Sequence, residues 1–215
     1  MSKANPYSKS PVHITQGSGK MCGIVSINTS TKTNSFCQKM QINQDSICKY
    51  CYAERFEGLF FTLHKHLIAN SELLSSRRLA KDEIPVIYQD VCRINSYGEL
   101  INETHYRNIC AIAETNPHCT FTLWTKRLNL VSSYRPVNLT IIYSNPKIDD
   151  PLEIIPHAVD GVFNVITAKY AISHNIHPNC TGHCRTCMRC YLKFPPGVIY
   201  EILKSDQKKF EGYND

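Results

Sequence analysis

The stretch IPVIYQDVCRINSYGELINETHYRNICAIAETNPHCTFTLWTKR, residues 84–127, predicts a strand, a helix and another strand in succession. Its first part contains an apolar strand that ends near SYGEL. The middle part is typical of a helix, with Asn102 as a candidate N-cap and Pro117 just beyond its end. The last part, CTFTLWTKR, alternates in polarity and is rich in Thr, Phe and Trp, as strands are. Two strands joined through a helix indicate a parallel pair with a right-handed crossover.

The same alternation extends in both directions from this unit. Upstream, the apolar run MCGIVSIN at residues 21–28 predicts a strand, and residues 52–78 predict one long helix with apolar residues every three or four positions. Downstream, a short helical piece at 127–134 precedes strands at 138–145 and 161–168, with an acidic loop between them at 148–159. The segment PPGVIYEILKS at 195–205 predicts a terminal helix that its prolines begin.

Chain length decides between the architectures that such alternation permits. Five or six βα units fit into 215 residues, whereas a complete eightfold barrel takes about 250. We therefore expect an α/β fold with a partial (β/α) barrel, and an open doubly wound sheet is the alternative. We expect three regions: a basic N-terminal segment at 1–20, the partial barrel at 21–170, and a cysteine-rich metal-binding tail with the terminal helix at 171–215.

Composition excludes several classes of protein. The chain is 42% hydrophobic and 20% charged, which is typical of globular proteins and not of disordered ones. No apolar run approaches the roughly 20 residues of a membrane span, and the polar N-terminus shows no secretory signal. We therefore expect a cytoplasmic protein. The net charge of +6 permits contact with phosphates without demonstrating it.

Cysteine is the most informative residue type in this sequence. There are 11 cysteines, an odd number, and in a reducing compartment clustered thiols indicate metal binding rather than disulfides. Seven of them form two groups, one before residue 52 and one after residue 179. The four scattered ones are expected to be buried as small hydrophobic residues: Cys22, Cys92, Cys110 and Cys119.

The first group consists of Cys37, then Cys48 after ten residues, then Cys51 after two more. A C-x-x-C pair presents two sulfurs to one metal, and a third thiolate can join from upstream. A four-iron cluster held by three cysteines keeps one iron open for another ligand. The alternative is a structural zinc site built from Cys48, Cys51 and two further ligands.

The residues CKYCYA, directly after the first strand and its loop, resemble the cluster loop of radical S-adenosylmethionine (SAM) enzymes. In that superfamily the residue before the last cluster cysteine is aromatic and lies against the adenine of SAM, and Tyr50 occupies this place. The second strand ends in RINSYGE, which is similar to the glycine–glutamate loop that binds the SAM amino group. FTLWTKR and TIIYSNP resemble the third and fourth strands of small phage-encoded members, some of which end in a cysteine-rich tail.

The resemblance implies a radical SAM-like partial barrel and a set of site residues. Cys37, Cys48 and Cys51 would be the ligands of a catalytic [4Fe–4S] cluster, with Cys22 as the alternative third ligand. The residues implied to bind SAM or to lie beside it are Tyr50, Asn95, Ser96, Gly98, Glu99, Lys126 and Ser144. For Asn95, Ser96, Lys126 and Ser144, an ordinary role in polar loops is the equal alternative.

The second group places Cys180, Cys184, Cys187 and Cys190 within eleven residues. This spacing is similar to the ligand runs of ferredoxin-type [4Fe–4S] sites, and Zn²⁺ is the alternative. No glycine loop follows it, so we interpret it as an auxiliary or structural site. Two arrangements stay open: both groups could share one cluster, and histidines could replace some thiols as ligands. The nearby candidates are His174, His177 and His183.

Together these features predict a radical SAM-like iron–sulfur enzyme that cleaves SAM to a 5′-deoxyadenosyl radical. It would need an electron donor, act on an unknown substrate such as a nucleic acid or a small metabolite, and work in the host cytoplasm if phage-encoded. The rival is a non-enzymatic zinc- or cluster-binding protein that contacts nucleic acid or a protein partner. A member that keeps a cluster but no longer cleaves SAM is a third possibility.

Overall fold

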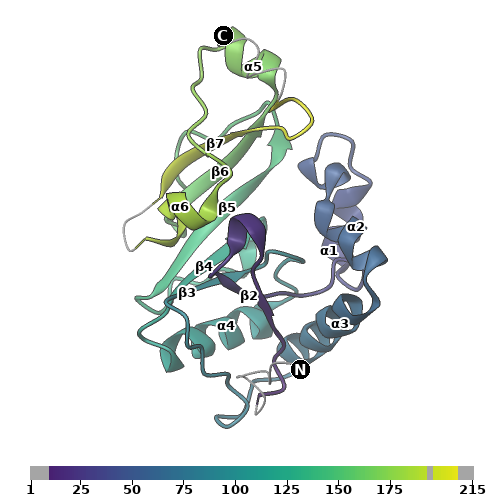
Figure 1. The fold of residues 1–215 in the computed structure, drawn as a ribbon, viewed down its shortest axis with the longest axis vertical. Helices are drawn as coiled ribbons and strands as arrows, with labels where there is room; N and C mark the ends of the chain where they lie inside the picture. Colours follow the sequence, from purple (N-terminus) through teal and green to yellow (C-terminus); the bar gives the residue numbers. More distant parts are fainter. Residues whose placement is uncertain (1–9, 193–195, 208–215) are drawn as a thin grey trace.

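A seven-stranded open sheet forms the centre of the computed structural model, which describes residues 10–192 and 196–207 (Figure 1). The strands lie in chain order, β1(Ile14–Gln16), β2(Val25–Ile27), β3(Val91–Ile94), β4(Thr120–Thr125), β5(Leu139–Ile148), β6(Gly161–Ile166) and β7(Gly197–Ile202). Strand β1 is antiparallel to β2, and every later neighbour pair is parallel. The expected α/β class with a mainly parallel sheet is confirmed. The strand order never reverses, unlike that of a doubly wound sheet.

Helices occupy the long connections at the start of the sheet. Between β2 and β3 the chain forms α1(Ser35–Gln41), η2(Ile47–Tyr50), α2(Tyr52–Leu59) and α3(Phe61–Ser76), and between β3 and β4 it forms α4(Glu103–Thr115). The later connections contain only short helices: η3(Leu128–Leu130), α5(Ala168–Ser173), α6(Cys184–Cys187) and η4(Arg189–Tyr191). Asn102 caps α4 as predicted, because its side chain accepts a 3.0 Å hydrogen bond from the His105 amide.

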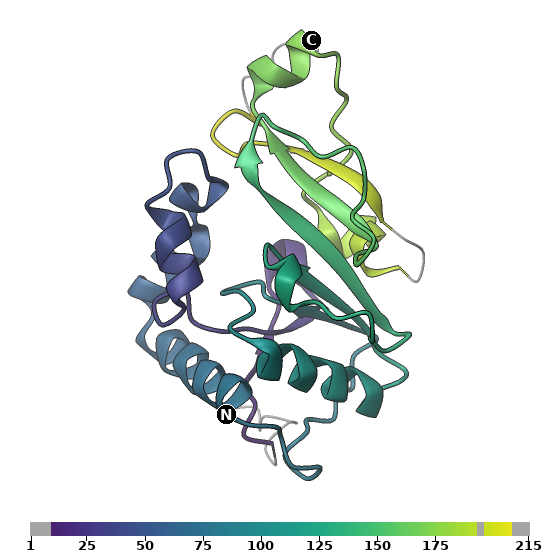
Figure 2. The same ribbon diagram turned by 180° about the vertical axis from the view of Figure 1, so that it is seen from behind.

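The main hydrophobic core lies between α3, α4 and one face of the sheet. It contains Leu74 of α3, Ile109 of α4 and Phe121 of β4, all fully buried. Figures 1 and 2 show these two helices side by side along the same face. Cys92, Cys110 and Cys119 belong to this core, which confirms the role expected for them. The same prediction was wrong for Cys22, because that side chain is exposed.

The opposite face, here called the inner face, is covered by the cysteine-rich segment and by η1(Gly19–Met21). Tyr191 packs with Val91 of β3 and Ile24 in a second apolar cluster, to which Cys184 and Cys190 also belong. The Thr122 hydroxyl on β4 donates a 2.9 Å hydrogen bond to the Cys190 carbonyl. The second cysteine group is thereby attached to the sheet itself.

Two predicted helices differ from the structure. The long helix at 52–78 is divided into α2 and α3, because Phe60 adopts an extended conformation with φ −119° and ψ 101°. The predicted terminal helix at 195–205 is strand β7, whose β-branched and aromatic residues pair in parallel with all of β6.

Residues on both sides of the expected central region contribute strands to the sheet. Residues 14–16 of the N-terminal segment form β1, and the tail supplies the last strand of the same sheet. Residues 1–9, 193–195 and 208–215 of the predicted regions lie outside the described residues. None of the helices in the described part of the chain is long and apolar enough to cross a membrane.

Candidate metal and cofactor site

The first cysteine group converges from three elements at one end of the parallel strands. Cys37 lies on α1, Cys48 on η2, and Cys51 is the residue from which α2 begins. Burial raises the pKa of the Cys37 thiol, and the neighbouring Glu99, Cys48 and Cys51 raise it further. Burial likewise raises the pKa of Cys51, and the Cys48 sulfur contributes in the same direction. The three thiols therefore lie close enough to interact electrostatically.

Cys22, the alternative third ligand, lies elsewhere. The preceding residue, Met21, packs with Cys184, Met188 and Cys190 of the second group. The fold thus groups Cys37 with Cys48 and Cys51, and it brings the Cys22 segment to the other cysteines.

Local hydrogen bonds hold the first cysteine group in place. Ser46 caps η2 by accepting from the Cys48 amide at 3.1 Å, and its backbone bridges to Lys147 on β5. Asn34 caps α1, and its side-chain amide donates to the Glu99 carbonyl at 3.0 Å. The cysteine-bearing elements are therefore fixed both to the sheet and to the loop after β3.

A buried carboxylate that sequence reasoning missed anchors α2. Glu57 accepts hydrogen bonds from the Thr31 amide at 2.8 Å, from the Thr31 hydroxyl at 2.7 Å and from the Ser30 hydroxyl. His64 Nδ1 lies 3.0 Å from the same carboxylate. These bonds lower the pKa of Glu57 against the opposing effect of burial. No sequence signal distinguished Glu57 from the exposed acidic residues.

The predicted glycine–glutamate loop is tightly packed against the loop after β2. Gly98 has a φ of +77°, and a Cβ atom there would lie 2.3 Å from Thr29 Oγ1 and 2.4 Å from the Thr29 carbonyl oxygen. Only glycine fits both restrictions. Tyr52, which directly follows Cys51, donates a 2.6 Å hydrogen bond to the Ser96 carbonyl. The cysteine loop and the glycine–glutamate loop are thus joined.

Glu99, Lys126 and Ser144 meet at the same edge. The buried Glu99 carboxylate accepts from the Thr125 hydroxyl at 2.6 Å, and from the backbone amides of Leu100 and Lys126, each at 2.7 Å. Burial raises its pKa, and the Lys126 ammonium opposes that shift. Lys126 Nζ donates to Ser144 Oγ at 2.9 Å. Glu99 Oε2 accepts only the Lys126 amide among the described residues, so it has room for another donor.

Four buried polar atoms next to this loop have no hydrogen-bond partner among the described residues. They are Arg93 Nε, Asn95 Oδ1, Ser96 Oγ and Trp124 Nε1. All belong to β3, to β4 or to the residues directly after β3. An unpaired buried polar group costs about 1–3 kcal/mol. Their concentration here is what a site for a polar ligand requires, and Asn95 and Ser96 were two of the predicted residues.

Tyr50 lines a separate hollow beside the first cysteine group. This pocket, of about 280 Å³, lies between η2 and the residues that end β5, β6 and β7, and it also contains Lys49, Asp149 and Thr167. The Tyr50 side chain is 55% exposed, and the Lys49 ammonium lies 5.1 Å from its ring centroid. The ring is available for a planar ligand to stack on.

The thiols of the second cysteine group also interact electrostatically with one another. Burial raises the pKa of Cys190 to about 12, and the neighbouring Cys180, Cys184 and Cys187 contribute. The thiols that interact with Cys37 belong to the first group, and those that interact with Cys180 and Cys190 belong to the second. No three His, Cys, Asp or Glu side chains in the described part of the chain are placed to hold a single metal ion.

The three nearby histidines show no common arrangement around the thiols. His174 stacks on Tyr170 with ring centroids 3.9 Å apart, and His177 is exposed. His183 precedes α6, and its carbonyl accepts a 2.9 Å hydrogen bond from the Cys187 amide.

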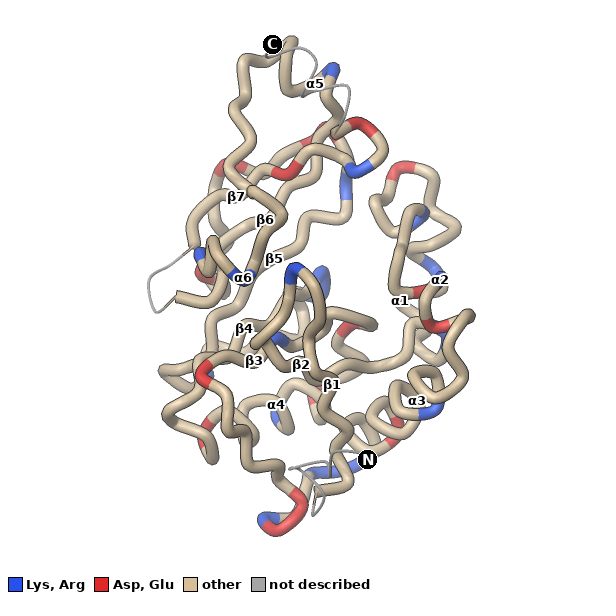
Figure 3. The backbone as a smooth tube through the Cα atoms, in the orientation of Figure 1, with Lys and Arg blue, Asp and Glu red and all other residues tan. Residues whose placement is uncertain are grey.

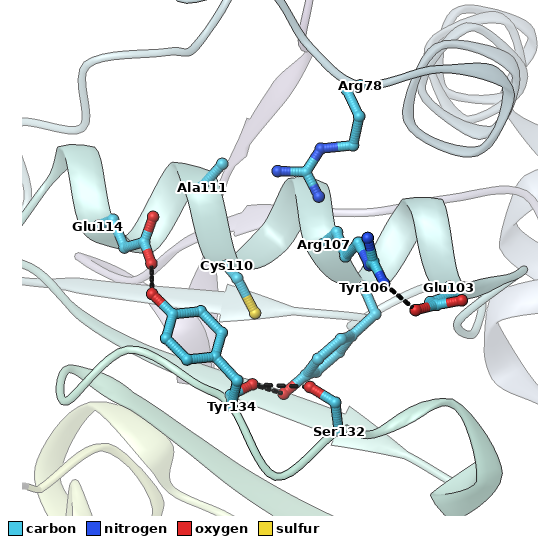
Figure 4. Close-up of a pocket in the computed structure, with 9 residues that line it drawn as sticks. All are labelled: Arg78, Glu103, Tyr106, Arg107, Cys110, Ala111, Glu114, Ser132 and Tyr134. Atoms are coloured by element: carbon cyan, nitrogen blue, oxygen red, sulfur yellow. Dashed lines mark hydrogen bonds and ion pairs between the residues drawn. The ribbon is translucent and has the colours of Figure 1, made fainter.

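The pocket in Figure 4 lies apart from both cysteine groups. It has a volume of about 320 Å³ and is formed by α4 and the segment before β5. Its polar groups bind one another: Tyr134 donates to Glu114, and Tyr106 donates to the Tyr134 carbonyl at 3.2 Å. No thiol of either group lines it.

Comparison with known proteins identifies a family but no activity. The family model of GP88, Gene product 88, matches residues 3–195, and the chain belongs to this family. The match is consistent with the phage origin expected above. No curated protein and no solved structure matches the chain.

Proposed function

We propose that this member of the Gene product 88 family is a radical SAM-type enzyme that cleaves SAM reductively at the first cysteine group. The observation that carries the proposal is the meeting of three thiols, the Gly98–Glu99 loop and Lys126 at one edge of the sheet. Each of these was implied independently by the resemblance, and each lies on a different connection of the fold.

The topology supports this proposal. Strands β2 to β7 are parallel and follow one another in chain order, and this strand order is also that of (β/α) barrels. The cysteine loop follows β2, the first parallel strand, and the glycine–glutamate loop follows β3. Active sites of α/β barrels lie at the carboxyl ends of the strands.

Three cysteine thiols are, by their chemistry, the donor set of a [4Fe–4S] cluster with one open iron. Cys37, Cys48 and Cys51 would hold it, and the three thiolates leave a coordination position for the amino and carboxylate groups of SAM. When bound and reduced, such a cluster would supply one electron to the sulfonium of SAM, so that one carbon–sulfur bond breaks to give methionine and the 5′-deoxyadenosyl radical.

The remaining residues would bind and orient SAM. Glu99 Oε2 has room for a hydrogen bond from the SAM ammonium group, and Asn95 Oδ1 and Ser96 Oγ are the unpaired polar atoms beside it. Tyr50 would stack on the adenine in its pocket. Lys126 and Ser144, already hydrogen-bonded to each other, would contact SAM or the substrate. An external electron donor is required, and a nucleic acid or a small metabolite would be the substrate.

The test is iron, acid-labile sulfide and zinc analysis of anaerobically purified protein, followed by assay of 5′-deoxyadenosine after reduction with dithionite in the presence of SAM. We expect about four irons with matching sulfide for this site, and 5′-deoxyadenosine that depends on both reductant and SAM. Cys51→Ala and Cys37→Ala should abolish the product. Cys22→Ala is the matched control and should retain it, because Cys22 is exposed and its neighbour packs on the other group.

Two results would overturn the proposal. Zinc without sulfide would leave the non-enzymatic metal-binding protein as the function. Product formation that survives Cys51→Ala would show that this group is not the site of cleavage.

A further inference from the structure

Arg93 is a buried cation on the inner face, and the Glu201 carboxylate is close enough to interact with it electrostatically. Arg93 lies in the middle of β3, and no ion pair with Asp or Glu includes it among the described residues. Its Nε is buried and has no hydrogen-bond partner there. The guanidinium carbon lies 4.5 Å from the Trp124 ring centroid, and the cation–π contact offsets only part of the cost of burial. Such a cation requires a nearby negative charge.

The sheet places the second cysteine group over Arg93. In the register of β3 and β4, Arg93 is directly opposite Thr122, and the Thr122 hydroxyl holds the Cys190 carbonyl at 2.9 Å. Tyr191, which follows Cys190, packs against Val91 of the same strand. Cys184, Cys190 and Tyr191 are all close enough to interact electrostatically with Arg93.

The charge of a metal centre would add to that of the Glu201 carboxylate, which also interacts with Lys20 and Lys204. Four thiolates around Zn²⁺, or around a [4Fe–4S] cluster in its 2+ state, both carry a net charge near −2. Other charged groups face the same place: Lys20, Arg189 and the half-buried Glu201. Figure 3 shows basic positions on η1 and α6, which lie beside each other. Lys20 is exposed and the Arg189 Nε donates to the Pro196 carbonyl, so Arg93 is the cation enclosed between the sheet and the thiols.

We propose that Cys180, Cys184, Cys187 and Cys190 hold an anionic tetrathiolate metal centre against the inner face of the sheet, and that Arg93 is its buried counter-ion. This inference does not depend on SAM cleavage. It makes Arg93 a positioning residue of the centre, acting through charge and not as a ligand.

The experiment measures metal retention by the full chain. Iron, sulfide and zinc analysis first identifies the metal. Cys190→Ala should remove the metal bound by this centre and leave the metal bound by the first cysteine group. Metal transfer to a chromophoric chelator is then followed in wild type and in Arg93→Gln. We expect Arg93→Gln to lose about 10- to 100-fold in metal affinity, the usual effect of removing an outer-shell partner.

Two variants separate charge from packing. Arg185→Gln is the matched control, because Arg185 lies between two of the cysteines but is exposed, and it should retain wild-type affinity. Arg93→Lys keeps the charge and loses the planar stack on Trp124, so it should restore most of the affinity lost in Arg93→Gln. If Arg93→Gln does not fold, the Arg93→Lys result decides alone.

Three outcomes would overturn the inference. Wild-type affinity in Arg93→Gln would show that the centre does not need this charge. Equal losses in Arg93→Gln and Arg93→Lys would make the role one of packing, and unchanged metal content in Cys190→Ala would exclude the centre itself.

Discussion

Replacing Gly98 by alanine tests whether the loop after β3 is held by steric fit. The residue has a φ of +77°, and the added Cβ would lie 2.3 Å from Thr29 Oγ1 and 2.4 Å from the Thr29 carbonyl oxygen. Left-handed backbone costs a residue with a Cβ about 1–2 kcal/mol. The carbonyl is backbone and Thr29 is fully buried, so neither atom can move away cheaply. Overpacking of this kind adds about 1–3 kcal/mol.

The two effects together predict a loss of about 2–5 kcal/mol in the free energy of unfolding. For a domain of this length that corresponds to a fall in Tm of about 4–20 °C. Urea denaturation measures the first quantity and thermal unfolding the second. Calorimetric titration with SAM should also show weakened binding, because the displaced loop carries Glu99.

Gly23→Ala is the control that isolates the clash. Gly23 also has a positive φ, of +90°, but a Cβ there meets no atom within 4 Å. It should therefore lose only the backbone contribution of about 1–2 kcal/mol. Equal losses in the two variants would refute the steric argument, and an unchanged Tm in Gly98→Ala would refute the positive-φ argument as well.

Two further predictions concern buried titratable groups. Glu57→Gln should lower the free energy of unfolding, measured by urea denaturation, by about 1–3 kcal/mol, because the new amide NH₂ would face donors of Ser30 and Thr31. Glu72→Gln, on the exposed side of α3, is the control and should change this free energy little. Equal effects of the two substitutions would contradict the anchoring role of Glu57. Burial lowers the pKa of His105 to about 4, so the folded protein keeps it neutral while the unfolded chain takes up a proton near pH 6.5. Stability from this group is present above pH 6.5 and is lost as the pH falls toward 4, by up to about 3 kcal/mol. The wild type should therefore lose more stability than His105→Gln between pH 7 and pH 4.5, and parallel losses would contradict this.

Local pattern was enough to predict several elements. The helix α4 has a capping asparagine, an amphipathic period and a proline beyond its end, and all three signals act within a few residues. Strands β4 and β6 were predicted by alternation and by β-branched residues. Such signals depend only on residues close together in the chain, so they can be recognised in the sequence without knowledge of the fold.

Strand β7 and the break at Phe60 were missed for a different reason. A short apolar run after prolines is compatible with a helix or a strand, and the open edge of β6 decided for the strand. Nothing local marks Phe60 as extended, because its neighbours on both sides are helical. In both cases contacts between distant segments overrode the local preference.

The candidate sites divide in the same way. The spacing of the cysteines and the order of the CKYCYA and SYGE motifs are properties of the sequence, so the two groups of candidate ligands were predicted from the sequence alone. The position of Arg93 beneath Cys190 depends on the register of β3 and β4 and on a hydrogen bond between residues 68 positions apart. The anchoring of α2 by Glu57 and the fit of Gly98 against Thr29 are likewise contacts between segments far apart in the chain. Residue types and spacing therefore determined which groups are candidates for metal binding. Only folding determined which charges, loops and unpaired atoms surround them, because electrostatic and steric effects act through space and not along the chain.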